Sequence, residues 1–325
     1  TNHTEFYISS KEAQDVIPQL PYIYDEPFAD SSQIPTFLVS KLAQKHVTVS
    51  LSGDGGDELF AGYNRHLWGG RIWNIVRRSP LFLCKTLATG LNALGEDQWN
   101  AIFFHINKIL PNRYHLQNSG RLAHQLARQL ESKNKNEFYQ GLVTHWNNPN
   151  ELVLNSVEPT TLITQTRQPS LSSYTEWMMA QDLVTYLPDD ILTKLDRASM
   201  AVSLEARVPF LDHRVVELSW QLPLKWKIHN NISKSILRDV LYRYVPRALI
   251  DRPKMGFGIP LNIWLKNDLR DWAEYLLDES RLRREGILNP IPIRKKWNEH
   301  VSGKANWQYL LWDVLMFQSW LEANN

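Results

Sequence analysis

The pattern of hydrophobic and polar positions predicts a mainly helical chain with a short buried strand at residues 47–51. This run is β-branched and mostly apolar, as in a parallel strand that is covered on both faces. The strand ends in a loop, residues 52–58, which holds three glycines, two aspartates and a glutamate, and an apolar pattern resumes at Leu59. In an α/β sheet, ligands bind to loops that leave the carboxyl ends of strands. This loop is therefore the first candidate site.

The chemistry of the loop allows two interpretations. Its glycines permit positive φ and let a ligand approach the main chain, while its carboxylates can hold a divalent cation. A tight acidic turn without a ligand is the other interpretation, and the loop alone does not decide between them. It is not a Walker loop, because no Gly-Lys-Ser/Thr follows, and the ligand spacing of an EF-hand is absent.

Residues 1–66 predict the remainder of a nucleotide-binding α/β core. Residues 5–8 are expected to form a strand, and Ser9-Ser10-Lys11-Glu12 is a capping box that opens a helix. Ser31 or Ser32 is expected to cap a second helix, which leads into the strand at 47–51. Two strands are too few for a sheet with both faces covered, so we expect its opening strands to lie upstream of Thr1.

Residues 67–169 show helical periodicity with polar joins and contain no recognisable motif. We interpret this stretch as an all-helical insertion. Phe103 and Phe104 are expected in its core, and Cys84 lies within the helical pattern.

Residues 170–325 are also predicted to be helical and to complete the site. Pro188-Asp189-Asp190 is expected to open a helix, with proline in the first turn and acids at the positive end of the dipole. That helix is predicted to carry Lys194 and Arg197 on one face and to extend to Glu205. A solvated face would also explain the two basic residues.

A loop at residues 252–260 places Lys254 near Gly256 and Gly258, between two prolines. Flexible backbone beside a compact positive charge suits a lysine that reaches a phosphate or a developing oxyanion. The loop is weak evidence by itself, because most exposed lysines contribute little.

Composition removes several classes of function. The chain has 325 residues, 43% of them hydrophobic, and a net charge of +2, so neither nucleic acid nor an acidic partner is expected. No apolar run approaches the ~20 residues that a membrane helix requires, and no signal peptide is present. Cys84 is the sole cysteine, which excludes disulfides and predicts a reducing cytoplasm. The start at Thr1 predicts a piece of a longer protein.

Four blocks of sequence together indicate a family. They are Asp25-Glu26-Pro27-Phe28-Ala29-Asp30-Ser31-Ser32, Leu51-Ser52-Gly53-Asp54-Gly55-Gly56-Asp57-Glu58-Leu59-Phe60-Ala61-Gly62-Tyr63, Leu204-Glu205-Ala206-Arg207-Val208-Pro209-Phe210-Leu211-Asp212 and Lys254-Met255-Gly256-Phe257-Gly258. In this order and spacing the chain resembles the synthetase domain of glutamine-dependent asparagine synthetases, essentially throughout from about Phe6. The combination is highly specific.

The resemblance implies a fold, a reaction and two cofactors. The fold would be α/β and largely helical, with a truncated parallel sheet similar to that of the ATP pyrophosphatases and a large helical extension. Residues 1–325 would be a single synthetase domain, divided at 66 and 169 as above. ATP with Mg²⁺ would adenylate the side-chain carboxylate of aspartate, and ammonia derived from glutamine would then displace AMP to give asparagine. Magnesium on the polyphosphate and cations near the developing charge suit this chemistry.

The resemblance also assigns individual residues. Ser52 and Gly53 would contact ATP, and Asp57 would help to hold Mg²⁺. Catalytic roles would fall to four further residues: Asp54, Arg197, Glu205 and Lys254.

These four residues match the family to different degrees. Asp54 stands where many members carry glutamate, at the position tied to the acyl-adenylate, and Arg197 stands where some carry a lysine near the phosphates. Lys254 matches the lysine that would stabilise the transition state of adenylation. Glu205 and Arg207 could equally be a structural ion pair.

The chain departs from the family pattern at two points. The pyrophosphate loop Ser-Gly-Gly-x-Asp-Ser is absent, because Ser52-Gly53-Asp54 lacks the second glycine and the final serine. The amino-terminal glutaminase domain, with its cysteine nucleophile, is absent as well. We therefore expect a carboxyl-terminal remainder that is inactive alone and has the missing glutaminase domain as its partner. The resemblance leaves a homodimer open.

Two alternatives to aspartate amidation remain at this point. The chain could belong to a relative that amidates another carboxylate, such as a sugar acid or a β-lactam precursor. It could instead be a non-catalytic domain that binds a nucleotide or a partner protein.

Overall fold

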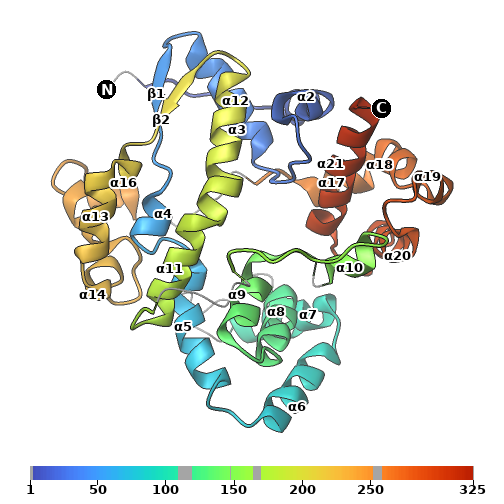
Figure 1. The fold of residues 1–325 in the computed structure, drawn as a ribbon, viewed down its shortest axis with the longest axis horizontal. Helices are drawn as coiled ribbons and strands as arrows, with labels where there is room; N and C mark the ends of the chain where they lie inside the picture. The colour runs from blue at the N-terminus through green and yellow to red at the C-terminus, as the bar shows by residue number, and fades with distance from the viewer. Residues whose placement is uncertain (1–2, 109–118, 147, 164–169, 252–257, 325) are drawn as a thin grey trace. The chain divides into compact units, whose positions relative to one another are not determined.

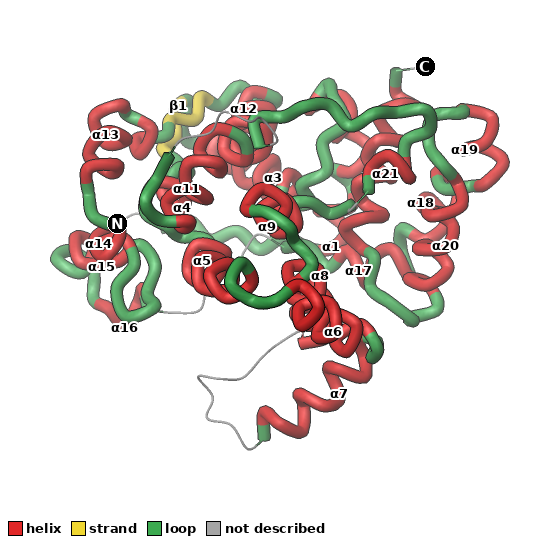
Figure 2. The backbone as a smooth tube through the Cα atoms, turned by 60° about the horizontal axis from the view of Figure 1, so that its bottom comes forward, coloured by secondary structure: helices red, strands yellow, loops and turns green. Residues whose placement is uncertain are grey.

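The computed structural model describes residues 3–108, 119–146, 148–163, 170–251 and 258–324. The chain divides into two compact units, unit 1 with residues 1–62, 179–285 and 308–325, and unit 2 with residues 63–178 and 286–307. Helix predominates in the described residues, and a short pair of strands lies in unit 1 (Figure 2). The prediction of a largely helical chain with a small parallel sheet is confirmed.

Unit 1 contains the two strands and most of the amino- and carboxyl-terminal helices. Its first helices are α1 (Ser10–Gln14), α2 (Leu20–Tyr24), α3 (Gln33–Gln44) and α4 (Gly56–Leu59). The middle helices are α11 (Tyr174–Val184), which begins in unit 2, α12 (Thr193–Met200), α13 (His213–Gln221), α14 (Leu224–Lys227), α15 (Ser235–Leu241) and α16 (Arg247–Ile250). The last are α17 (Leu261–Lys266), α18 (Arg270–Leu276), α19 (Glu279–Glu285) and α21 (Gln308–Ala323).

The sheet consists of β1 (Val49–Leu51) and β2 (Glu205–Arg207), which pair in parallel (Figure 1). Val49 pairs with Glu205 and Leu51 pairs with Arg207. Because the strands are parallel, the segments that follow them leave from the same edge of the sheet. The prediction of a strand covered on both faces is wrong for the described chain, since Leu51 is 75% exposed. Two strands alone cannot cover the faces and edges of a sheet.

Local capping signals at the helix starts are confirmed in part. Ser9 and Glu12 form the predicted capping box at α1, and Asp212 accepts the backbone N–H of Arg214 at the start of α13. Ser32 precedes α3 but does not cap it, because its backbone is helical and its hydroxyl donates to Asp30 Oδ2 (2.7 Å).

Two predicted elements are wrong. Residues 5–8 form no regular secondary structure, because no described strand lies beside them to accept their hydrogen bonds. The helix that carries Lys194 ends at Met200, so Glu205 lies in β2 and not on that helix. Ser203 has a left-handed backbone (φ 59°), which ends the helix and turns the chain into the strand.

Pro188 occupies the predicted position near the start of a helical segment. That segment, Leu187–Leu192, is a π-helical turn that leads directly into α12. The hydroxyl of Thr193 donates to the carbonyl of Pro188 (2.9 Å). The first residue of α12 thus provides a hydrogen-bond partner for a carbonyl of the π-helical turn.

The regular elements described in unit 2 are helices. It contains α5 (Asn64–Val76), α6 (Leu81–Asn92), α7 (Glu96–Asn107), α8 (Ser119–Leu130), α9 (Lys135–Val143), α10 (Pro149–Leu152) and α20 (Pro290–Val301). Tyr139, Trp177 and Met178 form a buried cluster in its core. Phe104 is 61% exposed, so its expected place in the core is wrong.

None of the helices in the described ranges is long and apolar enough to cross a membrane.

Candidate functional site

The acidic loop, residues 52–58, follows β1 at the carboxyl edge of the sheet and runs into the first residues of α4. The N–H of Ser52 donates to the carbonyl of Arg207 (2.8 Å), which extends the parallel ladder by one residue. The hydroxyl of Ser52 donates to Asp54 Oδ2 (2.5 Å). This bond folds Asp54 back toward the end of the strand. Ser52, Gly53 and Asp54 therefore lie in the turn that follows β1, and Asp57 comes next in the first turn of α4.

Gly53 and Gly55 differ in whether the fold requires a glycine at that position. A Cβ at Gly53 would meet no atom within 4 Å, so packing does not require a glycine there. Gly53 is also exposed, which leaves its main chain open to a ligand. Gly55 adopts φ 79°, and a Cβ there would lie 2.6 Å from Leu211 Cδ2. Gly55 is thus needed for the turn, whereas Gly53 is the position that is free for binding.

Asp57 lies in the first turn of α4, where the helix dipole favours a negative charge. Lys234 Nζ lies 3.0 Å from Asp57 Oδ1, and the two side chains are 30% and 25% exposed. Lys234 comes immediately before α15 and contacts the loop from a distant part of the sequence. No sequence signal points to Lys234, because a lone lysine outside any motif does not stand out.

The segment after β2 packs against the acidic loop. The ring of Phe210 lies edge-on to that of Phe60, with centroids 6.0 Å apart, and Phe210 also lies beside Gly56. Glu205 lies at the start of β2, and Arg207 Nε donates to its Oε1 (2.7 Å). Both side chains are more than half exposed, so this pair contributes little to stability. The catalytic role of Glu205 stays a prediction.

Lys194 and Arg197 share α12 but differ in their surroundings. Lys194 Nζ lies 2.5 Å from Asp30 Oδ2, with both side chains largely buried, whereas Arg197 is exposed. Burial alone would raise the pKa of Asp30, but Lys194 and the hydrogen bonds from Ser32 outweigh it and hold that pKa below its usual value. Lys194 is a structural partner of the Asp25–Ser32 block, and the role of Arg197 near phosphates stays a prediction.

Lys254 lies outside the described residues, so its position relative to the acidic loop is not given by the structure.

Within the described ranges, no group of three or more His, Cys, Asp or Glu side chains could hold a metal ion. Mg²⁺ in nucleotide sites takes only one or two protein carboxylates and completes its shell with phosphates and water. Asp57 is one carboxylate that could serve in this way, and it already lies beside a positive charge. The donor set therefore fits Mg²⁺ that arrives with a polyphosphate, and it does not fit a metal centre built from protein ligands alone.

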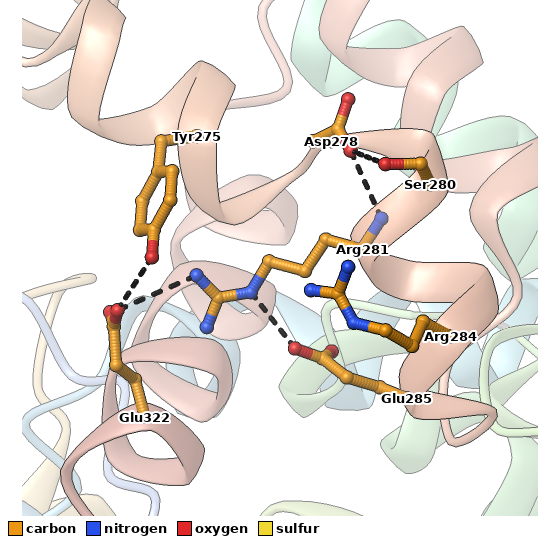
Figure 3. Close-up of a pocket in the computed structure, with 7 residues that line it drawn as sticks. All are labelled: Tyr275, Asp278, Ser280, Arg281, Arg284, Glu285 and Glu322. Atoms are coloured by element: carbon orange, nitrogen blue, oxygen red, sulfur yellow. Dashed lines mark hydrogen bonds and ion pairs between the residues drawn. The ribbon is translucent and has the colours of Figure 1, made fainter.

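A separate hollow of about 350 Å³ lies among α18, α19 and α21 (Figure 3). Arg281 crosses it, with its Nε 2.8 Å from Glu285 Oε1 and its Nη1 3.6 Å from Glu322 Oε1. Tyr275 donates to Glu322 (2.9 Å) and lies under the guanidinium. Because Arg281 is paired with Glu285 and Glu322, we interpret the hollow as a structural contact that holds α21 against α18 and α19.

Comparison with known proteins identifies the family of this chain. The asparagine synthase family matches residues 1–322. The chain belongs to this family. The acidic loop and the Leu204–Asp212 block, which carried the resemblance in the sequence, are the segments that meet at the carboxyl edge of the sheet.

Individual relatives agree with this membership. The sequence is 30% identical over 328 residues to glutamine-hydrolyzing asparagine synthetase 1 of Bacillus subtilis (strain 168). The aligned residues cover 98% of this chain and 47% of the relative. It is 28% identical over 152 residues to glutamine-hydrolyzing asparagine synthetase of Homo sapiens, covering 42% of this chain and 26% of the relative. The chain thus spans about half the length of the curated relatives that it matches over nearly all of its residues.

Proposed function

We propose that the protein is an ATP-dependent ligase that converts the side-chain carboxylate of aspartate into an amide. A carboxylate oxygen attacks the α-phosphorus of ATP, and pyrophosphate leaves. Ammonia then attacks the carbonyl carbon, loses a proton, and AMP leaves with the electron pair of the broken C–O bond. The products are asparagine, AMP and pyrophosphate. Membership of the asparagine synthase family supports this reaction.

The observation that carries the proposal is the acidic loop at the carboxyl ends of β1 and β2. Ligands of open α/β sheets bind at that edge. The exposed main chain at Gly53 leaves room for a phosphate or ribose to approach, and the N–H and hydroxyl of Ser52 are directed by bonds to Arg207 and Asp54. These contacts hold the loop in place before a ligand arrives, so binding ATP costs little ordering of the loop.

Asp57 is the residue that would hold Mg²⁺ on the polyphosphate of ATP. The metal would neutralise charge on the phosphates as pyrophosphate departs. Asp54 is proposed to lie beside the acyl-adenylate, with its carboxylate oriented by Ser52. Arg197 and Lys254 are proposed as cations for the phosphates, and Glu205 as a further catalytic residue. Their contributions rest on the family resemblance.

The identity of the acceptor is the finer part of the proposal. Asp54 has a shorter side chain than the glutamate that many family members carry, so the room beside the adenylate differs from that of those members. We propose aspartate as the acceptor because the relatives are named asparagine synthetases.

The experiment measures which carboxylate triggers the release of pyrophosphate. The protein, expressed from its complete coding sequence, is incubated with ATP, Mg²⁺ and ammonium, and with aspartate, glutamate or a sugar acid in turn. We expect pyrophosphate only with aspartate, together with equal amounts of asparagine and AMP. Release with another carboxylate would reassign the acceptor. No release with any carboxylate, from folded protein that binds ATP, would make it a nucleotide-binding domain without ligase activity.

A further inference from the structure

Lys234 is attached to the acidic-loop region through both its side chain and its main chain. Its Nζ lies 3.0 Å from Asp57 Oδ1, and its backbone N–H donates to the carbonyl of Phe60 (3.2 Å). Phe60 directly follows α4, the helix that carries Asp57. The two contacts therefore connect Lys234 to both ends of the same short helix. Its ammonium group is placed by the backbone as well as by the attraction of the carboxylate.

The ion pair lies in a space that only glycine leaves open. A Cβ at Gly62 would lie 1.9 Å from Asp57 Oδ1 and 2.3 Å from Lys234 Cε. The N–H of Gly62 also donates to the carbonyl of Asp57 (2.7 Å), so this approach is tight. A Cβ at Gly56 would lie 3.7 Å from Lys234 Nζ. Gly62 therefore makes room for the pair between Asp57 and Lys234.

The backbone of Lys234 is unusual for a lysine. Its φ is 53°, in the left-handed region that residues with a side chain seldom adopt. Such conformations persist where the surroundings hold them, and they gather at functional sites. A glycine or asparagine would adopt this φ more easily, so the side chain of Lys234 has a use that outweighs the conformational cost.

We propose that Lys234 is a positioning residue for Asp57 and holds the place of the divalent cation until the nucleotide binds. This inference rests on the proposed function, in which Asp57 holds the Mg²⁺ of Mg-ATP. Without a nucleotide, the ammonium of Lys234 neutralises Asp57 and keeps it oriented. The pair is partly exposed, so its net stabilisation is small and a doubly charged cation can replace the lysine. The released ammonium then has the triphosphate as its neighbouring anion.

The test uses Mn²⁺ as the probe and measures free Mn²⁺ by electron paramagnetic resonance. Four variants are compared without nucleotide: Lys234→Met, Asp57→Asn, the double variant, and Lys225→Met as the matched control. Lys225 is an exposed lysine of α14 in the same unit. Lys234→Gln serves as a second neutral variant if Lys234→Met does not fold, and circular dichroism checks the fold of each protein.

We expect Lys234→Met to bind Mn²⁺ about twofold to fivefold more tightly than the unaltered protein, because the competitor for Asp57 is gone. Lys225→Met should bind like the unaltered protein. The double variant should bind no more tightly than Asp57→Asn alone, because the gain depends on Asp57. A purely structural role for Lys234 would give unchanged or weaker Mn²⁺ binding and would overturn the inference. A gain that persists in the double variant would overturn it too.

Pyrophosphate release separates this inference from the proposed function. If the unaltered protein forms asparagine while Lys234→Met binds Mn²⁺ like Lys225→Met, the function stands and the placeholder role fails. If the unaltered protein releases no pyrophosphate but the Mn²⁺ pattern is as expected, the link between Lys234 and Asp57 stands and the ligase assignment fails.

Discussion

Asp57 lies in the first turn of α4, close to the edge of the sheet, and it is paired with Lys234. Changing Asp57→Asn keeps the size of the side chain but removes the charge that would hold Mg²⁺. Adenylation should therefore fall by at least the ~10²-fold typical of losing one electrostatic stabiliser. Pyrophosphate release with ammonia as nitrogen donor measures it. Asp239→Asn, on the exposed side of α15, is the control and should be unaffected. An unchanged rate in Asp57→Asn would make Asp57 a turn residue only.

The prediction for Lys254 uses functional measurements and no structural contact, because the residue lies outside the described ranges. If its ammonium meets phosphoryl charge only as the transition state forms, Lys254→Ala should lower kcat sharply while ATP affinity hardly changes. Lys254→Arg should not restore the rate, because a planar guanidinium does not replace a compact ammonium. Single-turnover pyrophosphate release and ATP binding by calorimetry give the two quantities.

The contrasting result for Lys254 is that of an ordinary surface lysine. In that case Lys254→Ala would leave kcat unchanged and alter the free energy of unfolding by less than ~0.5 kcal/mol. Lys225→Ala provides the reference for such a residue. A rate equal to that of Lys225→Ala would remove Lys254 from the site.

At the residue scale, the sequence indicated the loop but not its charge partner. Ser52, Gly53, Asp54 and Asp57 are neighbours in the chain, so a glycine-rich acidic motif was enough to group them. Lys234 joins them only through the fold, and no spacing rule connects it to residue 57. Pairings of this kind require the three-dimensional structure or an alignment.

At the scale of elements, the Lys194–Asp30 ion pair connects α12 to the segment before α3. Lys194→Met would leave the Asp30 carboxylate largely buried and without its cation. We expect the free energy of unfolding to fall by about 2 to 4 kcal/mol, near the range for breaking a buried pair. Urea denaturation measures it. Lys41→Met, an exposed change on α3, should stay within about 0.5 kcal/mol. An equally small effect for Lys194→Met would contradict this role.

The same pair predicts a pH dependence with a definite sign. The pKa of Asp30 is lower in the folded chain than in the unfolded chain, so its ionised form stabilises the fold. That contribution is complete above the unfolded pKa of about 3.9 and is lost as the pH falls through the folded value. The difference in unfolding free energy between the unaltered protein and Asp30→Asn should be constant near neutral pH and shrink below about pH 4. A constant difference down to acid unfolding would contradict the assignment.

The elements that the sequence predicted correctly depend on local signals. The capping box at Ser9 involves residues within three positions of one another. The wrong elements depend on distant partners: residues 5–8 find no strand to pair with, and Glu205 becomes a strand because it pairs with Val49. Periodicity in the sequence cannot show such partners, because a short apolar run fits a helix or a strand equally well.

For the whole molecule, the family explains more than the pattern alone. Hydrophobic periodicity predicted the abundance of helix, and four separated blocks predicted the family, which the match over residues 1–322 confirms. The sequence pattern placed divisions at residues 66 and 169, and the two compact units divide at 62 and 178; no pattern predicted that the chain returns to unit 2 at 286–307. That division arises from contacts between segments far apart in the chain.

The last prediction concerns the nitrogen source of the chain as it stands. Cys84 is the sole cysteine; it lies within α6 of unit 2, and it is 2% exposed. A nucleophile for glutamine needs an accessible thiolate, and a buried thiol is inert. We therefore expect this chain alone to release no glutamate from glutamine, and Cys84→Ser to behave identically. Glutamate release is measured with a coupled dehydrogenase assay. Release that disappears in Cys84→Ser would show that helix α6 opens to expose the thiol.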